Sequence, residues 1–209
     1  MAGGITMAQQ APPATMPLTQ SEVRTEAVPP AVVASAVAAV AKLGEEVVLG
    51  HYQIAVDRMN PIWKDRTAKR AGGSESPEQQ AAAVAAQMVQ MGISMISCKP
   101  QGQPLAHEVS PGTKVVTENG VPGAQLVFTK WLVLVPTVTK FRIMHDQPGQ
   151  PPKVITIDKT SYQVAISDKN THDWTFIDGA NLKVNDLRGL FATLPQNLEL
   201  PPVTQHEAR

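Results

Sequence analysis

Six residues combine side-chain chemistry with a spacing that could bring them together in one pocket. Three share one face of a predicted strand over 173–178, and three lie on a helix expected to cross that sheet: Trp174, Phe176 and Asp178, then His51, Tyr52 and Asp57. General acid–base catalysis needs a carboxylate or an imidazole in a dry pocket that shifts its pKa. The two carboxylates and the histidine are therefore catalytic candidates, and the three aromatic residues are candidates for lining a ligand pocket.

The same residues also have a purely structural interpretation. Trp174 and Phe176 would belong to the core, and His51 would lie on a solvated helix face. Asp178 would accept hydrogen bonds from the backbone N–H groups that follow it, with Gly179 in a left-handed conformation. We favour this structural interpretation and keep the catalytic one as the alternative.

Other site chemistry has little support in the sequence. The five histidines never occur at the i, i+4 spacing that places two metal ligands on one helix face, and no glycine-rich phosphate-binding motif is present. The single Cys98 lies in an alternating strand, which favours a small core residue over a nucleophile or a ligand. We therefore predict no metal and no cofactor.

Charge and composition narrow the class of protein. The 209 residues include 18 Lys+Arg and 18 Asp+Glu, a balance that removes the electrostatic attraction on which nucleic-acid binding rests. A single cysteine excludes an intramolecular disulfide framework, and no uninterrupted apolar run of about 18 residues exists to span a bilayer. A globular domain with neither a nucleic-acid partner nor a transmembrane segment is expected.

Helical periodicity dominates the first half of the chain. From residue 31, apolar residues recur at Val33, Val37, Val40, Gly44 and Val47, and the period resumes after Gly50 until Asn60-Pro61 breaks or bends the helix. The basic run over 64–70 is interpreted as a solvated helix end rather than a site for anionic partners. Ser76, Pro77 and Gln79 then predict a capped helix that runs to Met91.

After Gly92 the period changes to two and β-branched residues take over. Antiparallel strands are predicted over 93–99, 105–109, 114–118, 125–135, 138–144, 154–167 and 173–178, followed by a short helix over 185–192. Both faces are apolar in 125–135, so this strand is expected to be central, with Trp131 in the main core. Pro136 predicts either a turn or a bulge that curves one long strand.

Three segments follow from this pattern. Residues 1–30 are rich in proline and lack an apolar period, so a disordered tail is expected there, before one α+β domain over 31–202 and a polar tail over 203–209. The small residues around Ala8 resemble the end of an export signal. If the reading frame starts upstream, the chain is expected to be exported to the periplasm, and otherwise to be cytoplasmic.

Helices followed by a curved antiparallel meander resemble the cone-shaped α+β fold of the nuclear-transport-factor-2-like superfamily, which is also described as cystatin-like. More locally, four sequence segments resemble segments of uncharacterised exported bacterial proteins: HYQIAVDRMNPIWKDRTAKRAGG, GISMISCKPQGQP, LVPTVTKFRI and DWTFIDG. The resemblance implies N-terminal helices packed on a curved sheet, with an apolar cone that can hold a small ligand. Some members of that superfamily use an Asp or a His–Asp pair for proton transfer.

Two functional hypotheses follow from the residues and the resemblance. The first is a non-catalytic binding or interaction module whose cone-like pocket receives a small apolar ligand or a protein partner, including a second copy of the chain in a homodimer. The alternative is a small-molecule isomerase, hydratase or cyclase that uses Asp/His proton transfer in the pocket. An enzyme needs a titratable group aimed at open volume, whereas a binding module can be lined by apolar residues alone.

Overall fold

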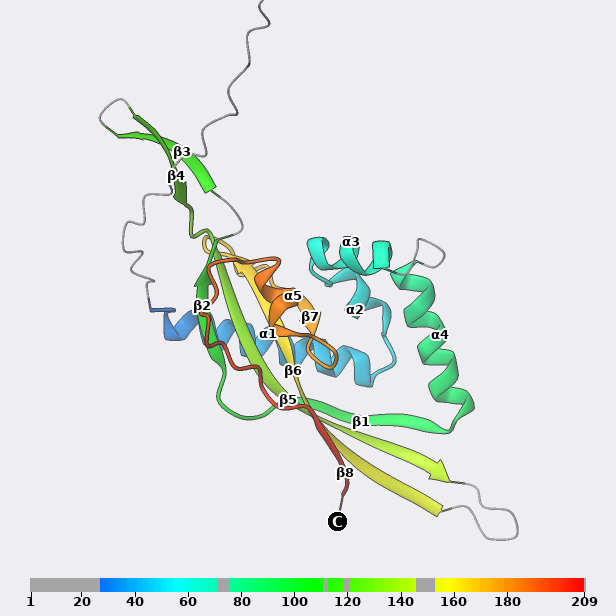
Figure 1. Cartoon of the computed structure of the whole chain (residues 1–209). Coiled ribbons are helices and arrows are strands. Elements are labelled where there is room, and N and C mark those ends of the chain that lie inside the picture. The colour runs from blue at the N-terminus through cyan, green and yellow to red at the C-terminus, as the bar shows by residue number, and fades with distance from the viewer. Residues whose placement is uncertain (1–26, 71–75, 111–112, 119–120, 146–152, 209) are drawn as a thin grey trace, which may run out of the picture.

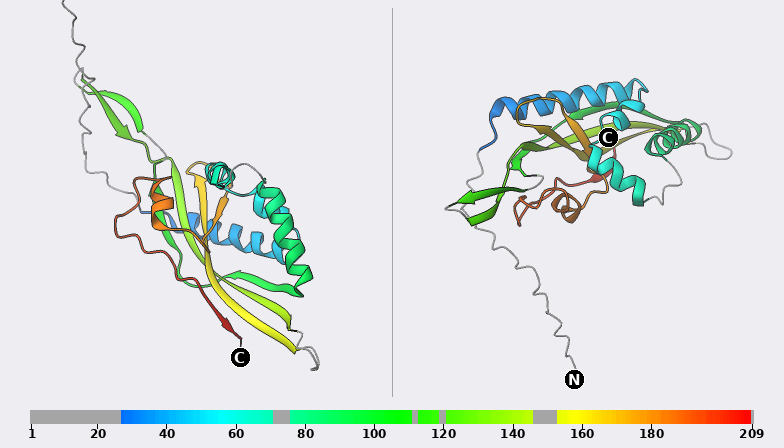
Figure 2. Two further views of the ribbon diagram at one scale, coloured as in Figure 1. Left: turned by 45° about the vertical axis from the view of Figure 1, so that its right-hand side comes forward. Right: turned by 90° about the horizontal axis from the view of Figure 1, so that it is seen from above.

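The computed structural model describes residues 27–70, 76–110, 113–118, 121–145 and 153–208, and the first 26 residues of the predicted tail lie outside this part. Helices come first and an open antiparallel sheet follows, which confirms the α+β class (Figure 1). Helix α1 covers one face of the sheet, and the C-terminal segment with α5 covers the other (Figure 2, right).

Helix α1 (Pro30–Val48) follows the predicted apolar period, with its buried stripe displaced by one residue at the start. The buried positions are Val32, Ala36, Val40 and Gly44, while Val33 and Val37 are half-buried at the edge of the stripe. A Cβ at Gly44 would lie 2.4 Å from the backbone oxygen of Cys98. Gly44 therefore lets the helix approach the sheet closely, and the helix runs through it without a break.

The predicted break at Asn60-Pro61 is confirmed. It separates helix α2 (Gln53–Asp57) from helix α3 (Pro61–Arg70). The corner between them pairs with strand β7, since the Phe176 N–H donates to the Arg58 oxygen at 2.7 Å and the Asn60 N–H donates to the Phe176 oxygen at 2.8 Å. This backbone pairing fixes both helices to the sheet.

Helix α4 (Pro77–Gln90) begins with the predicted capping box. The Gln79 N–H donates to Ser76 Oγ at 3.2 Å, and the Gln79 side-chain oxygen accepts from the Ser76 N–H at 2.8 Å. None of its residues, all of which belong to the described part of the chain, is buried. The helix stands beside the sheet rather than lying flat on it (Figures 1 and 2).

Two long strands form the centre of the main sheet, and the remaining strands pair along their outer sides. The central strands are β5 (Lys130–His145) and β6 (Lys153–Asp168). On the β5 side lie β1 (Ile93–Pro100) and β2 (Leu105–Val109), and on the β6 side lie β7 (Thr175–Asp178) and β8 (Thr204–Glu207). A separate hairpin, β3 (Thr113–Glu118) with β4 (Val121–Leu126), projects from the body (Figure 1).

Pro136 lies inside β5, so the predicted long strand is correct and the turn is not. The Gln101 N–H donates to the Pro136 oxygen, which places the proline's own nitrogen on that same outer side, where β1 has ended and β2 has not begun. The missing N–H therefore costs no bond between β5 and β6. The register shift lies in β1 instead, between Met95 and Ser97.

The strand predicted over 125–135 is correct from Lys130 onward and central as expected, but its start is wrong, because β4 ends at Leu126 and β5 begins at Lys130. The three residues between them form neither strand, although Val127 and Phe128 continue the apolar pattern. The last helix, α5 (Val184–Arg188), is shorter than predicted, and residues 204–207, for which no element was predicted, form the fully exposed strand β8 on β6.

Alternate residues of β5 and β6 contribute to two separate cores. The face toward α1 holds Trp131, confirmed as buried, with Val133, Val135, Ala165 and Phe176. The opposite face holds Leu132, Leu134, Tyr162, Val164 and Ile166 against side chains that follow β7, among them Leu187 and Phe191. On the face toward α1, the core does not extend past the C-terminal half of that helix. The part of the sheet left uncovered there forms the candidate site.

Candidate functional site

A groove of about 780 Å³ lies between the helices and the open part of the sheet. Its floor comes from β1, β5, β6 and β7, and its walls come from the end of α1 and from α2, α3 and α4. We call it the helix–sheet groove. Its volume falls within the roughly 300–1,000 Å³ of typical small-molecule sites.

The walls of the helix–sheet groove are mostly apolar. Helix α4 presents Ala81, Val84, Ala85 and Met88. Facing it are Leu43 and Val47 of α1, Trp63 of α3, and Met59 in the corner before α3. Val84 remains 57% exposed although it faces the groove, so the side chains of α4 do not close the space. An apolar molecule in the groove would cover this surface.

The floor of the groove is polar, which is unusual for the inward face of two central strands. Thr137 and Thr139 of β5 lie opposite Ser161 and Lys159 of β6, and all four line the groove. Ser161 is 7% exposed, and its Oγ has no hydrogen-bond partner among the described residues. A buried hydroxyl without a partner costs about 1–3 kcal/mol, so a ligand atom that accepted its hydrogen bond would recover this cost.

Cys98 lines the groove beside this polar floor and is not the fully buried core residue that the sequence favoured. Thr139 Oγ1 donates to its Sγ at 3.4 Å. Burial, supported by the negative charge of Asp178, raises the pKa of the Cys98 thiol, against the opposing effect of the Thr139 hydrogen bond. The thiol is therefore protonated at neutral pH, which does not suit a nucleophile.

Three of the six candidate residues lie on the groove. Tyr52, Phe176 and Asp178 all line it. Trp174 does not, because its ring is buried in the α1 core and its Nε1 donates to Ser35 Oγ at 3.1 Å. It borders instead a smaller hollow of about 140 Å³ between α1 and α2, which it shares with Phe176.

His51 and Asp57 point to solvent, away from the groove. His51 Nδ1 lies 2.7 Å from Glu46 Oε2, with 65% of the His51 side chain exposed. Asp57 Oδ1 accepts from Gln53 Nε2 at 2.9 Å on an exposed helix face. Of the three catalytic candidates, the structure brings only Asp178 to the groove.

Asp178 also has the structural role that the sequence favoured. Its Oδ1 accepts from the Ala180 N–H at 3.3 Å. The predicted left-handed conformation of Gly179 is wrong, since Gly179 is not among the glycines with positive φ. A glycine is needed there because a Cβ would lie 2.5 Å from the ring of Tyr162.

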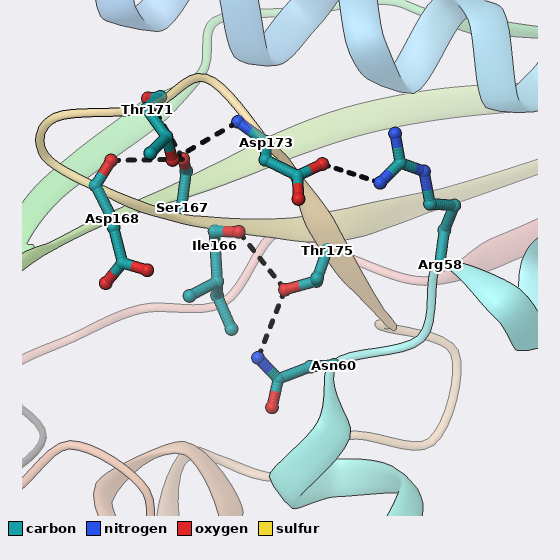
Figure 3. A network of polar contacts seen from close by, with 8 residues as sticks. All are labelled: Arg58, Asn60, Ile166, Ser167, Asp168, Thr171, Asp173 and Thr175. Atoms are coloured by element: carbon teal, nitrogen blue, oxygen red, sulfur yellow. Dashed lines mark hydrogen bonds and ion pairs between the residues drawn. The ribbon is translucent and has the colours of Figure 1, made fainter.

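A network of polar contacts holds the helix corner against β7 (Figure 3). Asn60 Nδ2 donates to Thr175 Oγ1 at 3.2 Å, and Thr175 Oγ1 donates to the Ile166 oxygen at 3.1 Å. Arg58 forms an ion pair with Asp173 at 2.6 Å. Tyr52 precedes α2, Met59 lies in the corner and Trp63 lies on α3, so this network sets the position of one groove wall.

The basic run over 64–70 makes internal contacts. Lys64 pairs with Glu78 of α4 at 2.6 Å and holds the pKa of that carboxyl at about 2. Arg70 pairs with Asp186 at 2.7 Å and lies over the Trp63 ring. These cations are thus partly neutralised within the protein.

Within the described ranges, no group of three or more His, Cys, Asp or Glu side chains could hold a metal ion. Among the same residues, no helix is long and apolar enough to cross a membrane.

The groove also contains residues outside the six candidates, among them Thr137, Thr139, Lys159 and Ser161. In β5, Thr137 and Thr139 alternate with the apolar Val138, so the sequence held a signal for these two. In β6, Lys159 and Ser161 lie in the continuous polar run 158–161, so no alternation marks them. Searches against protein-family models, curated proteins and solved structures find no match to this chain.

Proposed function

We propose that the protein is a binding module of the nuclear-transport-factor-2-like type that holds a small, largely apolar molecule in the helix–sheet groove. The observation that carries the proposal is the groove itself, about 780 Å³ of space with apolar walls and a few polar groups on its floor. Apolar walls supply affinity, and a few placed polar groups fix orientation. The order of helices and antiparallel sheet supports the resemblance in fold.

The alternative, a proton-transfer isomerase, hydratase or cyclase, depends on Asp178. This carboxylate lines the groove, and its charge contributes to the raised pKa of both Cys98 and Tyr162. Its hydrogen bond to the Ala180 N–H and its exposure favour the structural role. Under the binding proposal, Asp178→Asn keeps ligand affinity within about twofold, and loss of turnover of a bound molecule in this variant would support the enzyme.

Two adjacent alanines of α4 offer a matched test of the groove. Ala85 lines it, whereas Ala86 is exposed on the other side of the helix. The neutral dye Nile red should bind the wild-type protein with increased fluorescence. Ala85→Trp fills the space and should weaken binding about tenfold or more, while Ala86→Trp should leave it unchanged.

The single cysteine supplies a second, independent measurement. Because Cys98 lines the groove, bound Nile red should slow its modification by a maleimide. Equal dye binding by both tryptophan variants, or an unchanged rate of thiol modification, would place the dye elsewhere and contradict the proposal.

A further inference from the structure

The floor of the groove indicates which chemical class of ligand fits it. The observations are the apolar walls, the buried Ser161 hydroxyl, which has no hydrogen-bond partner among the described residues, and Lys159, two residues away on the same face of β6. We infer that the ligand is an amphipathic carboxylic acid, with its carboxylate on the floor formed by Thr137, Thr139, Lys159 and Ser161 and its hydrocarbon chain between the helices. This inference rests on the proposed function.

Lys159 is the cation available to such a carboxylate. It lines the groove, is half-buried, and forms no ion pair or side-chain hydrogen bond with the residues that the structure describes. The other lining cation, Arg70, is already paired with Asp186. An ammonium group with no anionic partner in the described part of the chain, on a groove with apolar walls, favours an anion as the ligand's polar end.

The strand register places Lys159 and Ser161 within reach of one head group. They are two residues apart on the same face of β6, roughly 7 Å along the strand. Lys159 lies opposite Thr139, and Ser161 lies opposite Thr137, with Cβ atoms of such pairs roughly 5 Å apart. A carboxylate accepts hydrogen bonds at both oxygens, so it can accept from the ammonium and the Ser161 hydroxyl together.

The negative charge in the groove lies beyond the Ser161 end of this floor, away from Lys159. Asp178 pairs with Gln163, which is two residues beyond Ser161 and four beyond Lys159 along β6, roughly 7 Å and 13 Å. Its carboxylate already accepts from the Ala180 N–H. An anionic head group at Lys159 is therefore separated from Asp178, whereas a cationic head group would be expected near Asp178 and away from Lys159.

Three molecules with the same chain and different head groups test the inference. Dodecanoate and dodecylamine, each below its critical micelle concentration, and dodecanol, below its solubility limit, compete with Nile red for the groove. Dodecanoate should displace the dye about tenfold more effectively than dodecanol, the scale expected for charge-assisted hydrogen bonds. Lys159→Gln should remove this difference while leaving dodecanol unaffected, and Ser161→Ala should reduce it.

Lys153→Gln is the matched control. Lys153 is exposed on the same strand, six residues from Lys159, and the substitution makes the same change in net charge. It should leave the preference for dodecanoate intact. Loss of the preference in this variant would mean that general electrostatics, not the groove floor, attracts the anion.

The outcomes separate this inference from the proposed function. Equal displacement by dodecanoate and dodecanol overturns the head-group inference and leaves the apolar binding site intact. Tighter binding of dodecylamine, lost in Asp178→Asn, also overturns it and moves the polar end to Asp178. Failure of Nile red to bind in the groove at all, as shown by Ala85→Trp and by Cys98 modification, overturns the proposed function itself.

Discussion

Tyr162 carries a buried hydroxyl on the face of the sheet opposite the groove. The residue is 1% exposed, and its hydroxyl has no hydrogen-bond partner among the described residues. Burial first, and then the negative charge of Asp178, raise the pKa of Tyr162 from 10.0 to about 12. The neutral phenol is thus the form compatible with the fold.

Replacement of Tyr162 by Phe should raise the free energy of unfolding by about 1–3 kcal/mol at neutral pH, because it removes an unpaired buried hydroxyl. Because the pKa of the Tyr162 phenol is raised in the folded state, ionisation of this group does not affect stability below its unfolded pKa of about 10. As the pH rises from there through about 12, the unfolded state ionises first, so the wild type should lose stability in this range relative to Tyr162→Phe. Urea denaturation from pH 7 to 11.5 measures both effects.

Tyr52→Phe is the control, since Tyr52 is the other tyrosine of the chain and lies half-buried at the groove. It should leave the alkaline dependence unchanged. A Tyr162→Phe protein less stable than wild type at pH 7 would show that the hydroxyl has a partner.

At the scale of elements, α4 differs from α1 in how it is held. Four residues of α1 are buried in the core, while α4 has none among its fourteen residues, every one of them described. A capping box and the Lys64–Glu78 ion pair hold the start of α4. Its position depends on few buried contacts, and the groove that it borders depends on its position.

Amide hydrogens of α4 should therefore exchange with solvent faster than those of α1, because local opening costs less where few apolar contacts are buried. Hydrogen-exchange mass spectrometry of peptides covering Pro77–Gln90 and Pro30–Val48 measures this difference. A groove ligand should slow exchange in α4 more than in α1, although the end of α1 also lines the groove. Equal protection in the two helices without ligand would show that α4 is anchored more firmly than its burial indicates.

At the scale of the whole molecule, the two cores share the same strands. Residues of β5 and β6 alternate between the α1 face and the C-terminal face, so loss of either core removes the support of both strands. Trp131 is 5% exposed in the α1 core, and Lys169 Nζ lies 4.5 Å from the centre of its ring. Substitution of Trp131 therefore tests whether loss of the α1 core also destabilises the opposite core.

Trp131→Ala should lower the free energy of unfolding by about 3–5 kcal/mol, the usual cost of truncating a buried aromatic. Both cores should still unfold in one transition, with the same midpoint by far-UV and near-UV circular dichroism. Trp63→Ala, at a half-buried groove wall, should cost less. Two separate transitions would instead mean that the faces of the sheet unfold independently.

The apolar period predicted most elements, and it failed where a segment was apolar throughout or polar throughout. The break between β4 and β5 was missed because apolar residues continue through Val127 and Phe128. Strand β8 was missed because all its residues are exposed and polar. Backbone pairing alone places it on β6, and pairing leaves no apolar pattern in the sequence.

The groove could be predicted in part. Tyr52, Phe176 and Asp178 were selected from their types and spacing, and they do line it. Lys159 and Ser161 were not selected, because which polar residue of a strand faces a cavity depends on where α1 ends and on how far α4 stands from the sheet. Those distances follow from packing between segments far apart in the sequence.

The position of α1 has a consequence for synthesis of the chain. Ala36 packs in the same cluster as Ala165, so the buried face of the first helix stays uncovered until a strand about 130 residues later is synthesised. At about 5–20 residues per second, that interval is roughly 6 to 26 seconds on the ribosome. During it the nascent chain carries an apolar helix without the strands that cover it, a period in which chaperones that bind exposed apolar segments would act.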